Sequence, residues 1–200
     1  MRLYGISLGE GNAKVGDAFT FSLPSKTTCP GASPWCLKRC YAHRYEQRRP
    51  KCRKAYAGNL TMTEDPEEFA RKMIGVLPRI MKTFRIHVSG DFHSADYVRA
   101  WTRICRAFPQ TRFWGYTRSW AVPHLAKDLA ELRDLDNIQL FASTDPDMPL
   151  PPKGWRRAFV QTDSRAAGIL CSAQTQDKGN CQECGYCVRR RKGDVVFKVH

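Results

Sequence analysis

Four cysteines near the end of the chain have a spacing that suits a metal cluster. They are Cys171, Cys181, Cys184 and Cys187, in the arrangement C-x9-C-x2-C-x2-C. Three thiolates separated by two residues each can bind three corners of a cubane, as in bacterial ferredoxins, and a cysteine from a nearby strand end completes the set. Zinc sites more often use two separated C-x2-C pairs. The spacing therefore predicts a 4Fe–4S cluster, with zinc as the alternative.

A second set of cysteines lies near the start of the chain, in the order C-x6-C-x3-C: Cys29, Cys36 and Cys40. We expect them in the loop after the first strand. Radical S-adenosylmethionine (SAM) enzymes place three cysteines in such a loop and leave one iron open, but their usual spacing is C-x3-C-x2-C. This set has three interpretations: a second cluster, further ligands to the first cluster, or thiols packed beneath a loop. The number of clusters is therefore one or two.

The remaining cysteines carry weaker signals. Cys105 lies on the apolar stripe of a predicted helix and is expected to be a core thiol. Cys52 has no partner at ligand spacing and is interpreted as structural or incidental. The total of nine is odd, and the N-terminal residues have no apolar core of signal-peptide length. We therefore expect a cytoplasmic chain without a disulfide framework.

The formal net charge is +14, and the excess is concentrated in two basic segments. Such segments suit nucleic acid, because each neutralised phosphate releases counterions, and the interleaved tyrosines offer stacking surfaces to bases. A solvated basic face is the alternative. The sequence does not separate DNA from RNA. The predicted nucleic-acid contacts are Lys38, Arg39, Tyr41, Arg44, Tyr45, Arg48, Arg49, Lys51, Arg53, Lys54, Arg189, Arg190, Arg191 and Lys192.

These residues must be positioned by an alternation of strands and helices. Strands are predicted at 19–23, 84–88, 112–116, 138–142, 158–161, 168–171 and 194–199. Helices are predicted from the cap Asp65, from the cap Ser94 and over 122–132. This order predicts an α/β fold with a parallel sheet. We expect a single domain over 1–200, a small and incomplete TIM-like β/α barrel with a cysteine-rich C-terminal segment; an open α/β sheet is the alternative.

Polar residues follow several predicted strands, where the active sites of such folds lie. Ser89, Asp91, Arg118 and Asp145 are the catalytic candidates, although Asp91 also suits a helix cap. None of them forms a recognised nucleophile–base pair, and no Gly-rich phosphate loop is present. The sequence leaves open whether the protein is an enzyme.

Several segments resemble the phage and plasmid gene-product-eighty-eight-like family. They lie at 11–14, 21–24, 29–32, 40–42, 85–92, 116–120 and 171–174, and the string HVSGDF at 87–92 is specific. The ending Cys40-Tyr41-Ala42 is also similar to a phage family thought to be radical-SAM-like. The resemblance implies a mobile-element context, hence the host cytoplasm, and an iron–sulfur barrel related to radical-SAM enzymes. It implies little about activity.

Three hypotheses follow. The first is a phage or mobile-element 4Fe–4S protein that binds DNA or RNA through its basic segments. The second is a radical-SAM-like or redox enzyme that uses an open-site 4Fe–4S cluster. The third is a zinc-stabilised nucleic-acid-binding module. No membrane partner is expected, since no apolar run approaches the ~20 residues that span a bilayer.

Overall fold

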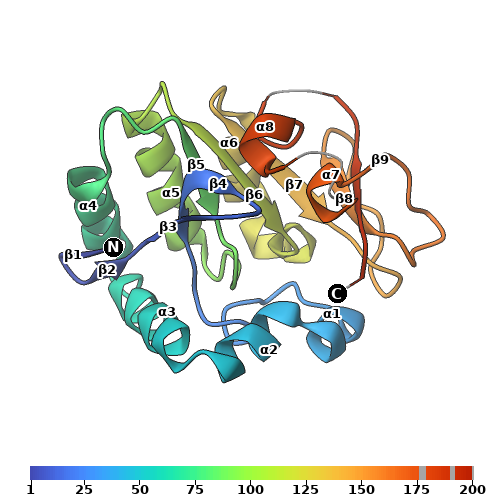
Figure 1. The fold of residues 1–200 in the computed structure, drawn as a ribbon, viewed down its shortest axis with the longest axis horizontal. Helices are drawn as coiled ribbons and strands as arrows, with labels where there is room; N and C mark the ends of the chain where they lie inside the picture. The colour runs from blue at the N-terminus through green and yellow to red at the C-terminus, as the bar shows by residue number, and fades with distance from the viewer. Residues whose placement is uncertain (176–178, 190–191, 200) are drawn as a thin grey trace.

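The core of the protein is an eight-stranded sheet in the order β3-β4-β5-β6-β7-β8-β10-β9 (Figure 1). The computed structural model describes residues 1–175, 179–189 and 192–199. All neighbouring strands are parallel except β3 and β4. A small hairpin of β1 (Arg2–Leu3) and β2 (Ile6–Ser7) precedes this sheet. The strands of the eight-stranded sheet are β3 (Gly9–Asn12), β4 (Gly16–Phe21), β5 (Thr83–Ile86), β6 (Arg112–Thr117), β7 (Ile138–Ser143), β8 (Arg156–Val160), β9 (Ile169–Leu170) and β10 (Val195–Phe197).

Strands β4 to β8 join the sheet one after another in chain order, and only β10 is inserted out of order. This winding confirms the predicted α/β class with a mostly parallel sheet. Strands β3 and β9 are its two edges. These two edge strands do not pair with each other in the described ranges, so closure into a TIM-like barrel is not shown and stays a prediction. The helices are α1 (Pro34–Arg39), α2 (Tyr41–Arg48), α3 (Pro50–Met62), α4 (Pro66–Val76), α5 (Ala95–Ala107), α6 (Ala126–Asp134), α7 (Ser172–Thr175) and α8 (Cys181–Cys184).

Two of the predicted helices begin at the expected caps. The Asp65 carboxylate accepts a hydrogen bond from the Glu68 amide at 3.0 Å, and the Ser94 hydroxyl accepts one from the Tyr97 amide at 3.3 Å. Such caps satisfy backbone donors that the first helical turn leaves free. The helix expected from residue 122 begins later, because two 3₁₀ turns, 119–121 and 123–125, precede α6.

One face of the sheet packs against α4, α5 and α6 to form the main core. Side chains alternate along each strand, so Phe113 of β6 enters this core while Trp114 faces the opposite side. Trp101 of α5 is the centre of the core, with ring centroids 5.7 Å from Phe21 and 5.6 Å from Phe84. No helix in the described ranges is long and apolar enough to cross a membrane.

The opposite face of the sheet is covered by the cysteine-rich segment, with α7 and α8 in front of the strands (Figure 1). Hydrogen bonds fasten α8 to the start of β4 and β5. The Cys181 amide donates to the Lys14 carbonyl at 2.8 Å, and the Gln182 amide group donates to Thr83 Oγ1 at 2.7 Å while it accepts from the Asp17 amide at 3.0 Å. This segment therefore forms a second layer on the face of the sheet opposite to the main core, which we call the inner face.

Candidate functional site

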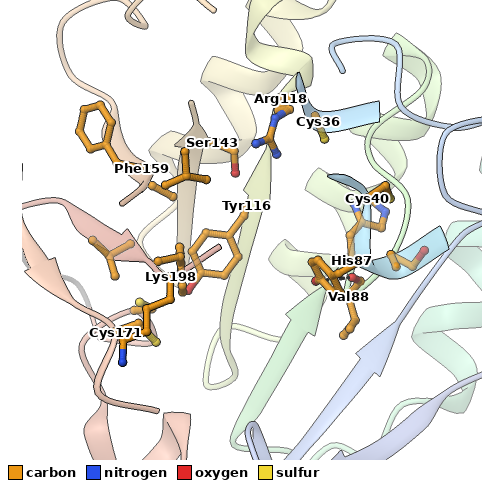
Figure 2. A pocket seen from close by; sticks show the side chains of 18 of the residues that line it. Cys36, Cys40, His87, Val88, Tyr116, Arg118, Ser143, Phe159, Cys171 and Lys198 are labelled. Atoms are coloured by element: carbon orange, nitrogen blue, oxygen red, sulfur yellow. Dashed lines mark hydrogen bonds between the residues drawn. The ribbon is translucent and has the colours of Figure 1, made fainter. Parts of the chain in front are cut away.

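Both cysteine sets line one cavity of about 240 Å³. Cys36 and Cys40 lie on one side of it, Cys171 and Phe159 lie on the other, and Tyr116 lies between them (Figure 2). The sequence predicted two separate sets, and the fold brings them to a common space above the inner face of the sheet. The cavity is lined by all seven candidate ligands: Cys29, Cys36, Cys40, Cys171, Cys181, Cys184 and Cys187.

The sequence predicted the N-terminal set in a loop, and the structure places two of its three cysteines on short helices or at their start. Cys36 lies within α1, and its amide donates to the hydroxyl of the cap Ser33 at 3.0 Å. Cys40 is itself the cap of α2, where its sulfur accepts from the His43 amide at 3.4 Å. Only Cys29 lies in a turn, with its amide bonded to the Lys26 carbonyl at 3.2 Å. Helix caps and turns thus hold all three sulfurs near the cavity.

The C-terminal set is surrounded by apolar side chains. Cys181 and Cys187 pack against the cluster that contains Trp114, and Tyr116 packs against the same cluster. Cys171 is buried, and Ser172 Oγ donates to the Cys184 sulfur at 3.1 Å. An apolar shell with a few hydrogen bonds to sulfur is the environment that tunes iron–sulfur clusters.

Burial changes the acidity of these thiols. It raises the pKa of Cys187 to about 12, and burial together with the Asp91 carboxylate raises the pKa of Cys29 to about 12. Burial also raises the pKa of Cys36 and Cys181. These four thiols are therefore protonated at neutral pH when free, and metal binding to them would release protons.

Two cations stand beside the C-terminal thiols, and neither is paired with a carboxylate in the described ranges. Burial lowers the pKa of Lys14, and the neighbouring Arg85 lowers it further; the other groups that act on it are Cys171, Cys181 and Cys187. Burial acts against the charge of Arg85, but the nearby tyrosines and thiols give its pKa a net rise. Both side chains are half-buried, and positive charge that is partly withdrawn from water favours an anion in the same place.

Two buried donors beside the same thiols also lack a partner in the described structure. They are Arg85 Nε and Trp114 Nε1. Buried polar groups are nearly always hydrogen-bonded, so each such donor requires an explanation. Sulfide and thiolate sulfurs of a cluster are acceptors, and these two donors therefore fit that group.

No three His, Cys, Asp or Glu side chains in the described ranges converge as ligands of a single metal ion. Tetrahedral zinc at about 2.3 Å from each sulfur brings its thiolates within about 4 Å of one another. The ligands of a cubane each bind a different iron and lie farther apart. The described residues therefore present no preformed site for a single metal ion, and zinc stays the alternative to a cluster.

Of the four catalytic candidates, Asp91 and Asp145 are fully engaged in holding the cavity wall. Asp91 accepts from Thr117 Oγ1 at 2.6 Å and from the Arg118 amide at 2.7 Å. Asp145 accepts from Ser33 Oγ at 2.8 Å and from Arg118 Nε at 3.1 Å. Both carboxylates are buried, and only Asp91 lines the cavity.

The other two candidates both line the cavity but differ in their contacts. Ser89 is buried and donates to the Glu46 carboxylate at 2.5 Å, which also accepts from the Ser25 amide at 3.0 Å. This contact clamps α2 against the loop after β5. Arg118 lines the cavity, with its guanidinium near Ser143 in Figure 2. Ser89 therefore has a supporting position, and Arg118 is the candidate best placed to touch a ligand.

Comparison with known sequences identifies the family. A sequence profile of the family described as "Gene product 88" matches residues 7–190. The chain belongs to this family. The "Gene 88 protein" of Mycobacterium phage L5 is 34% identical over 220 aligned residues, which cover 94% of this chain and 90% of the relative. The "Gene 88 protein" of Mycobacterium phage D29 is 32% identical over 223, with the same coverage. No solved structure matches.

These matches confirm the Gene product 88 resemblance, and both relatives are phage proteins. The iron–sulfur and radical-SAM-like relationship that the resemblance implied is not part of these matches and stays a prediction. The same holds for the host cytoplasm as its location.

The predicted nucleic-acid contacts of this Gene product 88 chain lie on the surface. All ten residues predicted between 38 and 54 are exposed, on α1, α2 and α3 or next to them. The Arg49 guanidinium stacks 4.8 Å from the centre of the Tyr45 ring. Arg189 and Lys192 are also exposed, whereas Arg190 and Arg191 lie outside the described residues.

The structure also places the residues that the sequence analysis left in weaker roles. Cys105 is fully buried in the core, as expected, and burial raises its pKa well above the usual value. Cys52 lies on α3 and does not line the cavity. Lys14 and Tyr116 were not predicted as site residues. The alternation along β5 and β6 was the available signal, since Arg85 and Tyr116 occupy the face opposite to Phe84 and Phe113.

Proposed function

We propose that this member of the Gene product 88 family holds a 4Fe–4S cluster on Cys171, Cys181, Cys184 and Cys187 and carries out redox chemistry on a small molecule in the adjoining cavity. The cluster would supply one-electron transfer. The observation that carries the proposal is the pair of cations, Lys14 and Arg85, beside these thiols without a carboxylate.

The charge of the site supports a cluster in two steps. First, four thiolates around a cubane give a net negative group, which balances the two cations and accepts hydrogen bonds from Arg85 Nε and Trp114 Nε1. Second, no acidic side chain other than Asp91 lines the cavity in the described structure, so carboxylates do not balance the two cations. A tetrathiolate zinc site is also anionic, and metal analysis separates it from a cluster.

The position of the cluster supports chemistry rather than a purely structural role. A structural site is closed on all sides, whereas these cysteines line a cavity that also reaches Arg118 and Ser143. The second cysteine set faces the same space with three thiols. A second cluster on these three thiolates would have one iron free to bind substrate. In this radical-SAM-like form of the proposal, the second cluster carries out the reaction.

The experiment that tests the cluster is anaerobic purification followed by analysis of iron, sulfide and zinc, with an absorption spectrum. We expect about four irons and four sulfides per chain and a broad visible band. About eight irons would place clusters on both sets. Zinc without iron contradicts the proposal and favours the zinc-stabilised module.

A second function, nucleic-acid binding, is favoured by one specific observation. Helices α1, α2 and α3, which carry the exposed basic residues, lie side by side along the bottom of the view in Figure 1. Arg39 and Tyr41 of these helices also line the cavity. Phosphate contacts from such a surface give affinity that falls steeply with salt. The redox cavity and the basic surface are compatible in one protein.

Substitutions on this basic surface test the second function. Arg48→Gln with Arg53→Gln should reduce the steepness of log affinity against log salt by about 1.4 for single-stranded oligonucleotides, because two phosphate contacts are lost. Fluorescence anisotropy at several salt concentrations measures this slope. Arg106→Gln with Lys127→Gln removes the same charge from exposed positions on α5 and α6 and is the matched control. Equal slopes for both double variants would contradict the proposed surface.

A further inference from the structure

Arg118 is held at its backbone and at its side chain. Its backbone amide donates to Asp91 Oδ2 at 2.7 Å, and its side-chain Nε donates to Asp145 Oδ2 at 3.1 Å. Asp145 is fully buried and is itself fixed by Ser33 Oγ at 2.8 Å and by the Asp147 amide at 3.1 Å. The guanidinium is therefore oriented before any ligand arrives, and preorganisation reduces the entropy that binding costs.

The Arg118 guanidinium still has donors to offer. In the part of the chain that the structure describes, Nε of Arg118 is its only side-chain atom with a hydrogen bond. The side chain is 19% exposed and lies at the cavity wall beside Ser143 (Figure 2). Two terminal nitrogens in a fixed plane match the two oxygens of a carboxylate or phosphate.

The charge of the cavity favours an anion. Within the described residues its lining includes five basic side chains and one carboxylate, that of Asp91: the basic ones are Lys14, Arg39, Arg85, Arg118 and Lys198. Lys14 and Arg85 stand beside the C-terminal thiols, where the proposed cluster would balance them. Arg39, Arg118 and Lys198 remain on the rest of the wall, against Asp91 in the lining and Asp145 behind Arg118.

We infer that the cavity binds a small organic anion and that the Arg118 guanidinium takes its carboxylate or phosphate group. This inference names the class of substrate for the redox site proposed above. Only the redox reaction itself rests on that earlier proposal. The binding of the anion depends on Arg118 and its two carboxylate anchors, all of which belong to the chain itself. Ser143, which also lines the cavity, adds a polar side chain next to this subsite.

The test is isothermal titration of the full chain with two probes, citrate and inorganic pyrophosphate, which separate a carboxylate from a phosphate ligand. We expect at least one probe to bind at millimolar concentration or tighter. Arg118→Lys, which keeps the charge but loses the planar fork, should weaken it by about tenfold. Arg157→Gln removes a different arginine, paired with Asp194 outside the cavity, and should bind as the wild type does.

A second variant is needed because Arg118→Gln alone leaves the buried Asp145 carboxylate unpaired, and such a variant could lose binding only because it misfolds. Arg118→Gln combined with Asp145→Asn removes both charges of the pair and should abolish binding. The inference is overturned if neither probe binds the wild type at about 10 mM, or if this double variant binds as tightly as the wild type. Iron analysis of the same samples keeps the two proposals apart: binding through Arg118 in a chain without iron supports this inference while it overturns the cluster.

Discussion

Cys181→Ala combined with Cys187→Ala should remove nearly all iron and sulfide from the anaerobically purified protein. These thiols supply two of the four proposed ligands and stand beside the cations Lys14 and Arg85. A cubane that loses two thiolates loses both its attachment and most of the negative charge that these cations require. Iron and sulfide analysis, with the visible spectrum, measures the effect.

Two further variants make this result specific. Cys52→Ala removes a half-buried thiol outside the cavity and should leave the iron content unchanged. Cys29→Ala combined with Cys36→Ala acts on the other wall of the cavity: a fall from about eight to about four irons would indicate a second cluster there. Full iron content in the Cys181/Cys187 double variant would show that the C-terminal set is not the main site.

Asp145→Ala is expected to lower the free energy of unfolding by about 3–5 kcal/mol, the usual cost of removing one partner from a buried ion pair. Its side chain is fully buried and accepts from Ser33 and Arg118, which come from α1 and from the end of β6. The loss would leave the Arg118 charge and the Ser33 hydroxyl without their acceptor. Urea unfolding monitored by circular dichroism measures this change.

The matched control for this prediction is Asp145→Asn. It keeps the shape of the side chain and one carbonyl oxygen as an acceptor, so the backbone contact with the Asp147 amide can persist. We expect a smaller loss than for alanine. If the two variants differ from the wild type by less than about 1 kcal/mol, Asp145 does not hold the cavity wall in the way that its contacts indicate.

Much of the fold could be predicted from the sequence because its signals are local. The cap residues Asp65 and Ser94 start α4 and α5, and short β-rich runs mark β5, β6 and β7 near their observed positions. Helices α1, α2 and α3 were missed in the basic segment. Their charged residues are almost all exposed, and α3 shows little amphipathic pattern, so tertiary contacts such as those of the buried Glu46 and Asn59 define these helices.

The site was harder to predict because it depends on contacts between distant segments. The cysteine spacing indicated two sets of ligands, but nothing local indicates that they share a cavity. The roles of Asp91 and Asp145 also depend on distant partners, since Asp145 joins Ser33 across 112 positions of the chain. The importance of Arg85 comes from the thiols that the fold places beside it.

The layered arrangement of the cavity constrains when a cofactor can be inserted. The hydrogen bond between Asp17 and Gln182 spans 165 positions, and it fastens the segment that carries the C-terminal cysteines over the first strands. A nascent chain that lacks this segment has only one of the two cysteine sets and no completed cavity wall. Loading of the proposed cluster on the C-terminal cysteines would therefore follow synthesis of nearly the whole domain.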